Sequence, residues 1–553
     1  MAQKNGSLLP FTRDAAFINR RAQARREAGE NLEALRLFRR AMEAAPDNLE
    51  YCVDTAELLN HMGCLRASYE LINSLINSGR ISRALRSGTA SSAALFGQAC
   101  NLSSLGCTHS AVAMLRRISG LPMDAECAEG LCDLRTHLAA EELLRSTVLR
   151  RNRLLRRMND CADAHDALRA CAVARRYLRQ RPGDPLAHAA MAWAQMLRGD
   201  QPASMEHLVH ALSMKHQDPW VLSIAARMLD SGEHGQARPA LENAYALSGD
   251  PYCDRTLLKQ ASALGMDALV MDISARLLEA DCCDPHASAC HAVAMVNMGE
   301  PARAALAVLR RSLEVYPGDA TAGHYLRLIE QLKPDDRPLP YPVNAMPREW
   351  ARAVAGLRIR LFSGDVSALA GDAHLIGLLE WGLYCPSGEV CESSAALLSR
   401  IGGDLAREAL WRCLTSYERP NGKLRAILSL MSEADIPLPR LVFAGGRLQR
   451  LSCRMISRMA AEDKTCVAVR AAARRLHEYP DAAVELSAML FFADGAAHDA
   501  HLMSSALECA YRIAHREFID LRALARRRHL SCARLMRAVN SLIQTYHPQE
   551  EPQ

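Results

Sequence analysis

Residues 29–48 read GENLEALRLFRRAMEAAPDN, and the pattern of this stretch recurs along the first half of the 553-residue chain. Its glycine returns at intervals that are mostly 33 or 34 residues long. A fixed period of this length indicates a repeat architecture in which each unit is one supersecondary motif. The glycines of the series are Gly29, Gly63, Gly106, Gly199, Gly232, Gly265 and Gly299.

The residues around each glycine predict a pair of antiparallel helices. Seven residues before the glycine stands an alanine in every copy except one, where Leu258 replaces it. Small residues follow five positions after most of the glycines, and mainly apolar residues follow nine and twelve positions after them. Offsets of four and then three are those of a buried helical face. The alanine on the preceding helix lets the two helices approach closely, and a proline such as Pro46 ends the second helix. Pro182 and Pro317 stand at equivalent ends elsewhere.

This pattern resembles the tetratricopeptide repeat (TPR) family, most clearly where Gly29, Ala34, Phe38, Ala41 and Pro46 stand at that family's positions. The resemblance implies an all-α, TPR-like α-solenoid over residues 15–332, with seven recognisable copies. We expect an irregular segment at 124–182, which is either two degenerate repeats or a long-helix insertion. We also expect a loop within 81–92 and a capping helix at 320–332.

The second half of the chain differs in pattern from the first. Residues 333–347 read KPDDRPLPYPVNAMP, and this run of prolines predicts a linker. Residues 348–546 show helical periodicity without a clear period and without a recognisable pair of strands. They predict a second all-helical domain, either a decayed repeat of the HEAT class or a compact bundle. Residues 1–14 and 547–553 would be tails.

Composition and charge point to a cytoplasmic protein of bacterial type. The chain has a net charge of +5, which is too small over this length to indicate nucleic acid or a membrane by itself. The first ten residues lack the apolar core of a secretory signal, so the nineteen cysteines are expected to be reduced thiols. No apolar run is long enough to span a membrane.

The TPR resemblance implies a concave face, lined by first helices, that holds a peptide or a helix of a partner protein. The chaperone-binding clamp of that family has basic and asparagine residues at set positions of the first helices. It is not recognisable here, because Asn19 and Gln23 stand at these positions in the first copy and neither is basic. The groove residues that we predict are Asn19, His188, Trp193, Met196 and Trp220; core packing is the alternative for the tryptophans. These observations favour a non-enzymatic scaffold whose partner is a protein or peptide of unknown identity.

The sequence contains no phosphate loop, nucleophile elbow or HExxH motif, so we expect neither an enzyme nor a cofactor. Residue types that ligate metals cluster at Cys282, Cys283, His286, Cys290 and His291. Adjacent helical residues point about 100° apart, so this set is not expected to converge on zinc. Cys385 and Cys391 have too few partners. The prediction is therefore no metal site.

Basic residues are concentrated in two segments. Residues 145–157 (RSTVLRRNRLLRR) predict an amphipathic helix with a basic face. Residues 521–539 (LRALARRRHLSCARLMRAV) resemble a bacterial helix-turn-helix, although His529 stands where that motif usually has glycine. In that motif Arg526, Arg527 and Arg528 would contact phosphate, while Arg534 and Arg537 would face the major groove. The alternative function is thus a TPR-containing transcriptional regulator that binds DNA, as opposed to a helical end with a solvated basic face.

Overall fold

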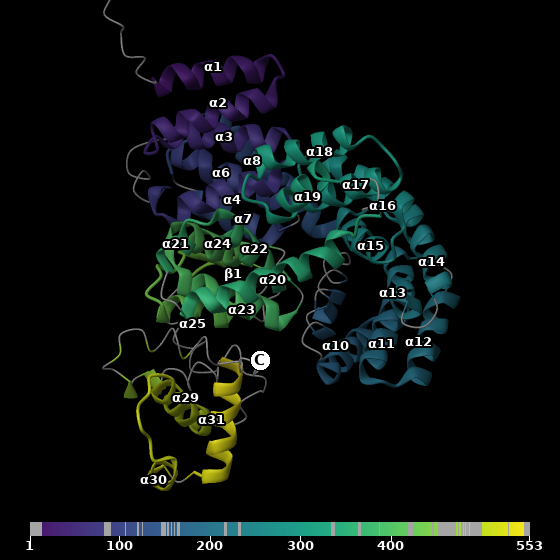
Figure 1. Cartoon of the computed structure of the whole chain (residues 1–553). Coiled ribbons are helices and arrows are strands. Elements are labelled where there is room, and N and C mark those ends of the chain that lie inside the picture. Colours follow the sequence, from purple (N-terminus) through teal and green to yellow (C-terminus); the bar gives the residue numbers. More distant parts are fainter. Residues whose placement is uncertain are drawn as a thin grey trace, which may run out of the picture.

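The computed structural model describes most of residues 14–546 (Figure 1). Its longer gaps are 82–89, 145–150, 333–337, 418–423 and 452–471, and between 472 and 499 it describes isolated residues. Shorter gaps lie at 106, 119–120, 124, 152–153, 156, 160, 163–165, 215–217, 231–233, 363–365, 386, 445–446 and 529.

The first half is an all-α solenoid of helical hairpins, which confirms the predicted TPR-like fold. All seven copies appear as pairs of helices, and five of the predicted glycines, all except Gly106 and Gly232, lie among the described residues. The hairpins are α1 (Ala15–Glu27) with α2 (Asn31–Ala44), α3 (Leu49–His61) with α4 (Leu65–Asn77), α6 (Ala90–Ser104) with α7 (Thr108–Ile118), α11 (Pro185–Arg198) with α12 (Gln201–Ser213), α13 (Pro219–Asp230) with α14 (His234–Leu247), α15 (Pro251–Ala263) with α16 (Asp267–Ala280), and α17 (Pro285–Asn297) with α18 (Ala302–Val315). The capping helix α19 (Ala320–Glu330) follows.

In two of the hairpins, a small residue of the second helix forms a hydrogen bond to the backbone of the first helix. Ser68 Oγ donates to the carbonyl of Ala56 at 2.7 Å, and Ser204 Oγ donates to the carbonyl of Ala192 at 2.8 Å. Both serines stand five residues after their glycine, and both alanines stand seven before it, so one contact recurs at equivalent places in two copies. A bulkier residue at either position would separate the helices. Five of the glycines adopt the left-handed conformation that turns the chain, with φ between +64° and +90°: Gly29, Gly63, Gly199, Gly265 and Gly299.

Between the third and fourth hairpins lie α8 (Ala125–Leu144) and α10 (Ala167–Gln180). Helix α10 packs on α11 in the way that the second helix of one hairpin packs on the first helix of the next hairpin. In the basic segment between them, Arg151 forms ion pairs with Asp184 and Asp218. These aspartates accept hydrogen bonds from the first backbone N–H groups of α11 and α13. This arginine therefore joins the N-terminal ends of two helices.

The loop expected within 81–92 lies mostly outside the described residues.

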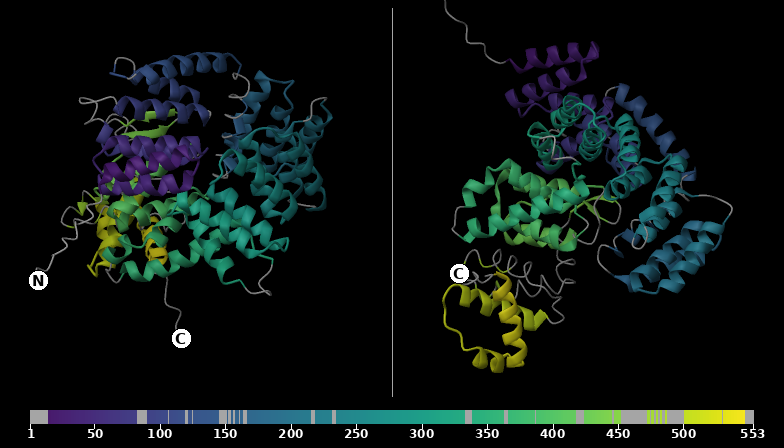
Figure 2. Two further views of the ribbon diagram at one scale, coloured as in Figure 1. Left: turned by 90° about the horizontal axis from the view of Figure 1, so that it is seen from above. Right: turned by 45° about the vertical axis from the view of Figure 1, so that its right-hand side comes forward.

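The array curls back so that its early turns touch its late ones (Figures 1 and 2). Arg39 of α2 donates to the backbone carbonyls of Glu314 and Val315 at the end of α18. The α3–α4 turn lies against the end of α16, since a Cβ atom added to Gly63 would stand 2.7 Å from the carbonyl oxygen of Ala280. These contacts join segments more than 200 residues apart.

The helix that follows the proline-rich segment begins earlier than the expected linker boundary. Helix α20 runs from Pro342 to Phe362, because proline fits the first turn of a helix, where its missing N–H is not needed. Leu339 and Tyr341, just before it, are buried in the core of the array. The side-chain amide of Asn297 both accepts from the backbone N–H of Leu339 at 2.7 Å and donates to its carbonyl at 3.2 Å. The described part of this segment is thus bound to the solenoid.

The remaining elements of the C-terminal half are mostly helical. They are α21 (Val366–Ala370), α22 (Ala373–Leu383), α23 (Gly388–Ile401), α24 (Gly403–Thr415), α25 (Leu424–Glu433), β1 (Leu441–Ala444), β2 (Arg447–Arg450), α29 (Ala500–Ala514), α30 (Leu521–Arg527) and α31 (Cys532–Tyr546). Helices α20–α25 pack around one hydrophobic core, and α29–α31 pack around another.

The expectation that this half holds no strand pair is wrong. Strands β1 and β2 pair antiparallel, with Leu441 opposite Arg450 and Ala444 opposite Arg447. Two glycines separate the strands in sequence, which is a signal for a tight hairpin rather than only a break between helices. Asn77 of α4 accepts from the backbone N–H groups of residues 440 and 441, so the hairpin is fastened to the N-terminal repeats.

Candidate functional site

Both tryptophans of the predicted groove lie in the hydrophobic core. Trp193 is 3% exposed and Trp220 is 8% exposed. The guanidinium of Arg227 lies over the Trp193 ring at 4.7 Å from its centroid, and the Trp220 ring lies 5.3 Å from that of Tyr252. Met196 is half-buried against the same core. These side chains stabilise the repeat stack and present little surface to a partner.

Asn19 and His188 are engaged with neighbouring helices. Asn19 is 7% exposed, and its amide donates to the Asp54 carboxylate at 2.8 Å. His188 Nδ1 lies 3.4 Å from the Nδ1 atom of His207, and its ring centroid lies 4.3 Å from that of His210. Burial lowers the pKa of His188, and the neighbouring imidazoles lower it further. The protonated form of this side chain is therefore disfavoured.

Helix α12 exposes a row of apolar side chains that the core does not use. Met205, Val209 and Leu212 are 52%, 58% and 48% exposed. Their spacing of four and then three residues places them on one face, while Ser204, Leu208 and Ala211 form the buried face. We call Met205, Val209 and Leu212 the α12 stripe. These three apolar residues do not stand at the positions of the repeat that form the core. That pattern is visible in the sequence, but the sequence analysis missed it.

In the C-terminal basic unit, Arg528 has a role in packing. Its guanidinium donates to Glu508 at 2.7 Å and to Ser505 Oγ at 3.0 Å, and only 15% of its side chain is exposed. The other predicted DNA contacts, Arg526, Arg527, Arg534 and Arg537, are exposed. His529 lies outside the described residues.

The five residues of metal-ligating type between 282 and 291 do not all meet at one point. The Sγ atom of Cys290 faces His286 Nε2 at 3.8 Å, while His291 Nδ1 lies 2.8 Å from the hydroxyl of Ser274 on another helix. Cys282 and Cys283 instead meet Cys64. The three Sγ atoms lie within 4.8 Å of one another, and no other group of three such ligands is found among the described residues.

The three sulfur atoms of this cluster interact with one another and with Arg311. Hydrogen bonding with Cys283 and Cys64 lowers the pKa of the Cys282 thiol, and the guanidinium of Arg311 lowers it further. Hydrogen bonding with Cys282 and Cys283, together with burial, raises the pKa of Cys64. Sequence reasoning missed Cys64 because 218 residues separate it from Cys282, and no local pattern marks such a pair.

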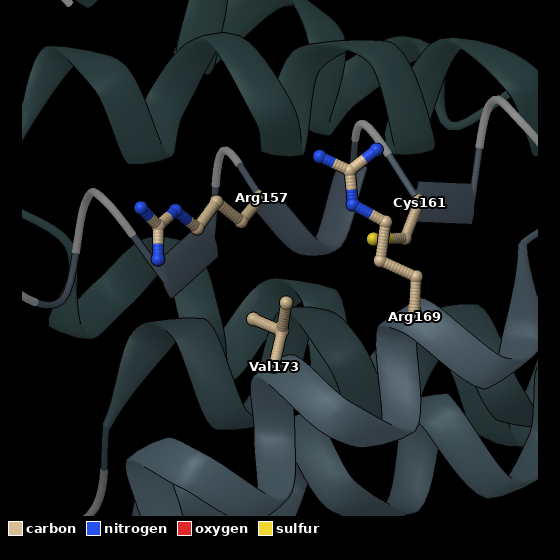
Figure 3. Close-up of a pocket in the computed structure, with 4 residues that line it drawn as sticks. All are labelled: Arg157, Cys161, Arg169 and Val173. Atoms are coloured by element: carbon tan, nitrogen blue, oxygen red, sulfur yellow. The ribbon is translucent and has the colours of Figure 1, made fainter. Parts of the chain in front are cut away.

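A small cavity of about 180 Å³ lies beside the irregular segment, lined by Arg157, Cys161, Arg169 and Val173 (Figure 3). Both arginines are exposed, and the described lining residues include no carboxylate, histidine or hydroxyl.

Among the described residues, no helix combines the length and the apolar character needed to cross a bilayer.

Comparison with known proteins finds resemblance at the level of solved structures. No family model and no curated protein sequence matches the chain. The TPR domain of P58(IPK) is 14% identical, with 59% of this chain and 99% of that chain covered and a TM-score of 0.21. The Naa15/Naa10 complex bound to HypK-THB has a chain that is 14% identical, with 96% and 76% covered and a TM-score of 0.25. Yeast Tom70 is 12% identical, with 86% and 94% covered and a TM-score of 0.27. The helical hairpins of this chain give it a TPR-like fold.

Proposed function

We propose that this protein is a non-enzymatic scaffold that binds a helix or peptide of a partner protein on the α12 stripe. The observation that carries the proposal is the exposure of three apolar side chains in one row. Contiguous apolar surface on a folded protein is typical of an interaction site. The stripe spans eight residues, or about 10 Å of helix, and this length suits the apolar face of a short partner helix.

The binding site differs from the concave face that the family resemblance implies. Helix α20 packs on the first helices α15 and α17, so the chain's own C-terminal half covers part of that face. Trp193 and Trp220 are buried, as described above. The second helix α12 remains open. We place the scaffold in the cytosol, where its nineteen cysteines would stay reduced.

Charged residues in the α12 stripe should weaken partner binding without unfolding the protein. We expect Val209→Glu combined with Leu212→Glu to weaken the complex at least tenfold, because a buried carboxylate opposes docking of an apolar face. A photo-crosslinking residue placed at position 205 identifies the partner, and titration of that partner gives the affinity.

Leu168→Glu is the matched control, since Leu168 is 77% exposed on α10, outside the stripe. It should leave the affinity unchanged, and the thermal stability of both variants should stay near that of the wild type. Equal loss of binding in the control, or full binding by the stripe variant, would refute the proposed site.

DNA binding is the second candidate function, and the exposed arginines at one end of the molecule favour it. Arg534 and Arg537 stand one turn apart on α31. Salt-dependent binding of a labelled duplex by the full chain, lost in the Arg534→Glu, Arg537→Glu variant, is the expected result for a regulator. Fluorescence anisotropy at low salt measures it, and absence of binding there would leave the protein-binding function alone. Arg528 should stay unchanged in this test because its loss would disturb the fold.

A further inference from the structure

Three cysteine thiols from two distant turns of the solenoid meet at one point. Cys64 directly precedes α4, whereas Cys282 and Cys283 follow Asp281, the residue that ends α16. All three Sγ atoms lie within 4.8 Å of one another, and those of Cys282 and Cys283 are 3.6 Å apart. Cys64 and Cys283 are fully buried, and Cys282 is half-buried.

The backbone holds these thiols in place. The N–H of Cys64 donates to the carbonyl of Leu59 at 2.9 Å, and the N–H of Cys283 donates to Asp281 Oδ1 at 3.1 Å. The close approach of Gly63 to Ala280 brings the two turns together. The cluster is therefore preorganised by contacts that do not involve the sulfur atoms.

We propose that Cys64, Cys282 and Cys283 bind one zinc ion. Zinc bonds thiolate sulfur at about 2.3 Å in a tetrahedron, which places neighbouring sulfurs about 3.8 Å apart, and the cluster fits this spacing. Three thiolates fill three of the four positions. A water molecule or another solvent ligand would take the fourth, since Cys282 is partly exposed.

The surrounding charge favours a divalent ion over a monovalent one. Three thiolates carry a charge of −3, and zinc leaves −1. The guanidinium of Arg311 interacts with both Cys282 and Cys283 and offsets part of the remaining negative charge. Copper(I), which also prefers thiolates, would leave one more negative charge in this site than zinc does.

A bound zinc ion would link the second repeat to the last two. Because the unfolded chain does not hold the three thiols together, the free energy of zinc binding becomes free energy of folding. The site would thus fasten the curled solenoid where its early and late turns meet.

The test measures zinc stoichiometry and cobalt spectra on the full chain under reducing conditions. We expect one zinc per chain after exchange into buffered zinc, and a thiolate-to-cobalt charge-transfer band when cobalt replaces it. Zinc should also raise the thermal midpoint by several degrees. Cys64→Ser and Cys283→Ser should each lose the band and the zinc-dependent shift.

Cys290→Ser is the matched control, because Cys290 is a fully buried thiol of the same region that lies outside the cluster. It should retain the metal. Circular dichroism of the metal-free variants shows whether they are folded, and the cobalt band of the wild type is informative even if they are not. The proposal is overturned if the reduced wild type binds no zinc, if the serine variants keep the band, or if the freshly isolated chain holds a disulfide at Cys64 in place of a metal.

Discussion

Replacing Gly63 by alanine should lower the free energy of unfolding by about 3 kcal/mol, about three times the effect of the same change at Gly29. Both glycines have φ of +76°, so both variants pay a left-handed penalty of about 1 kcal/mol. Gly29 has no atom within 4 Å of the added Cβ, whereas at Gly63 the Cβ would stand 2.7 Å from the Ala280 carbonyl oxygen. Overpacking of this kind costs about 1–3 kcal/mol more.

Urea unfolding of the two variants measures the difference, and Gly29→Ala controls for backbone conformation. Limited proteolysis should also cleave Gly63→Ala faster near residues 61–65, because the α3–α4 turn would be displaced from α16. Equal destabilisation of the two variants would show that these turns do not support each other in solution.

Arg528→Ala should destabilise the C-terminal helices by about 3 kcal/mol, whereas Arg526→Ala should change stability by less than about 0.5 kcal/mol. Removing the Arg528 guanidinium takes a partner from Glu508, which is 7% exposed. Arg475 remains near that carboxylate at 3.3 Å, which limits the loss. Arg526 is exposed.

The two residues lie two positions apart in the same basic run, so the comparison separates a packing role from a surface role. Hydrogen exchange of α29 and α31 measures local opening directly. If Arg526→Ala opened these helices as much as Arg528→Ala, the ion pair with Glu508 would not be the cause. A combined reversal of Arg526, Arg527 and Arg528 would confuse unfolding with loss of DNA contacts.

The hairpins could be predicted because each is specified by residues close together in sequence. The alanine before Gly63 and the serine after it encode a contact that forms within one copy, and the 34-residue period repeats it. The strands β1 and β2 were missed because they are four residues long, and their glycines match a helix break equally well. Arg528 was misplaced on the surface because its partner, Glu508, lies 20 positions away on another helix.

Contacts between distant copies have no periodic signal. The repeat pattern specifies how one repeat packs on its neighbour. It does not predict the hydrogen bond from Arg39 to Val315 or the approach of Cys64 to Cys282. For the same reason the exposed α12 stripe is visible in the sequence only after the core positions are known. Two of the five candidate groove residues, Trp193 and Trp220, were tryptophans, and this residue type prefers the interior.

The contacts between the first two hairpins and the last two fix the number of repeats between them. In an open solenoid, gain or loss of one unit lengthens or shortens the stack and leaves every other interface intact. Here one unit more between residues 65 and 280 would move the end of α16 past the α3–α4 turn, and Arg39 would no longer reach the carbonyl of Val315. We therefore expect the copy number between these two turns to be invariant among orthologues, while their loops vary freely in length.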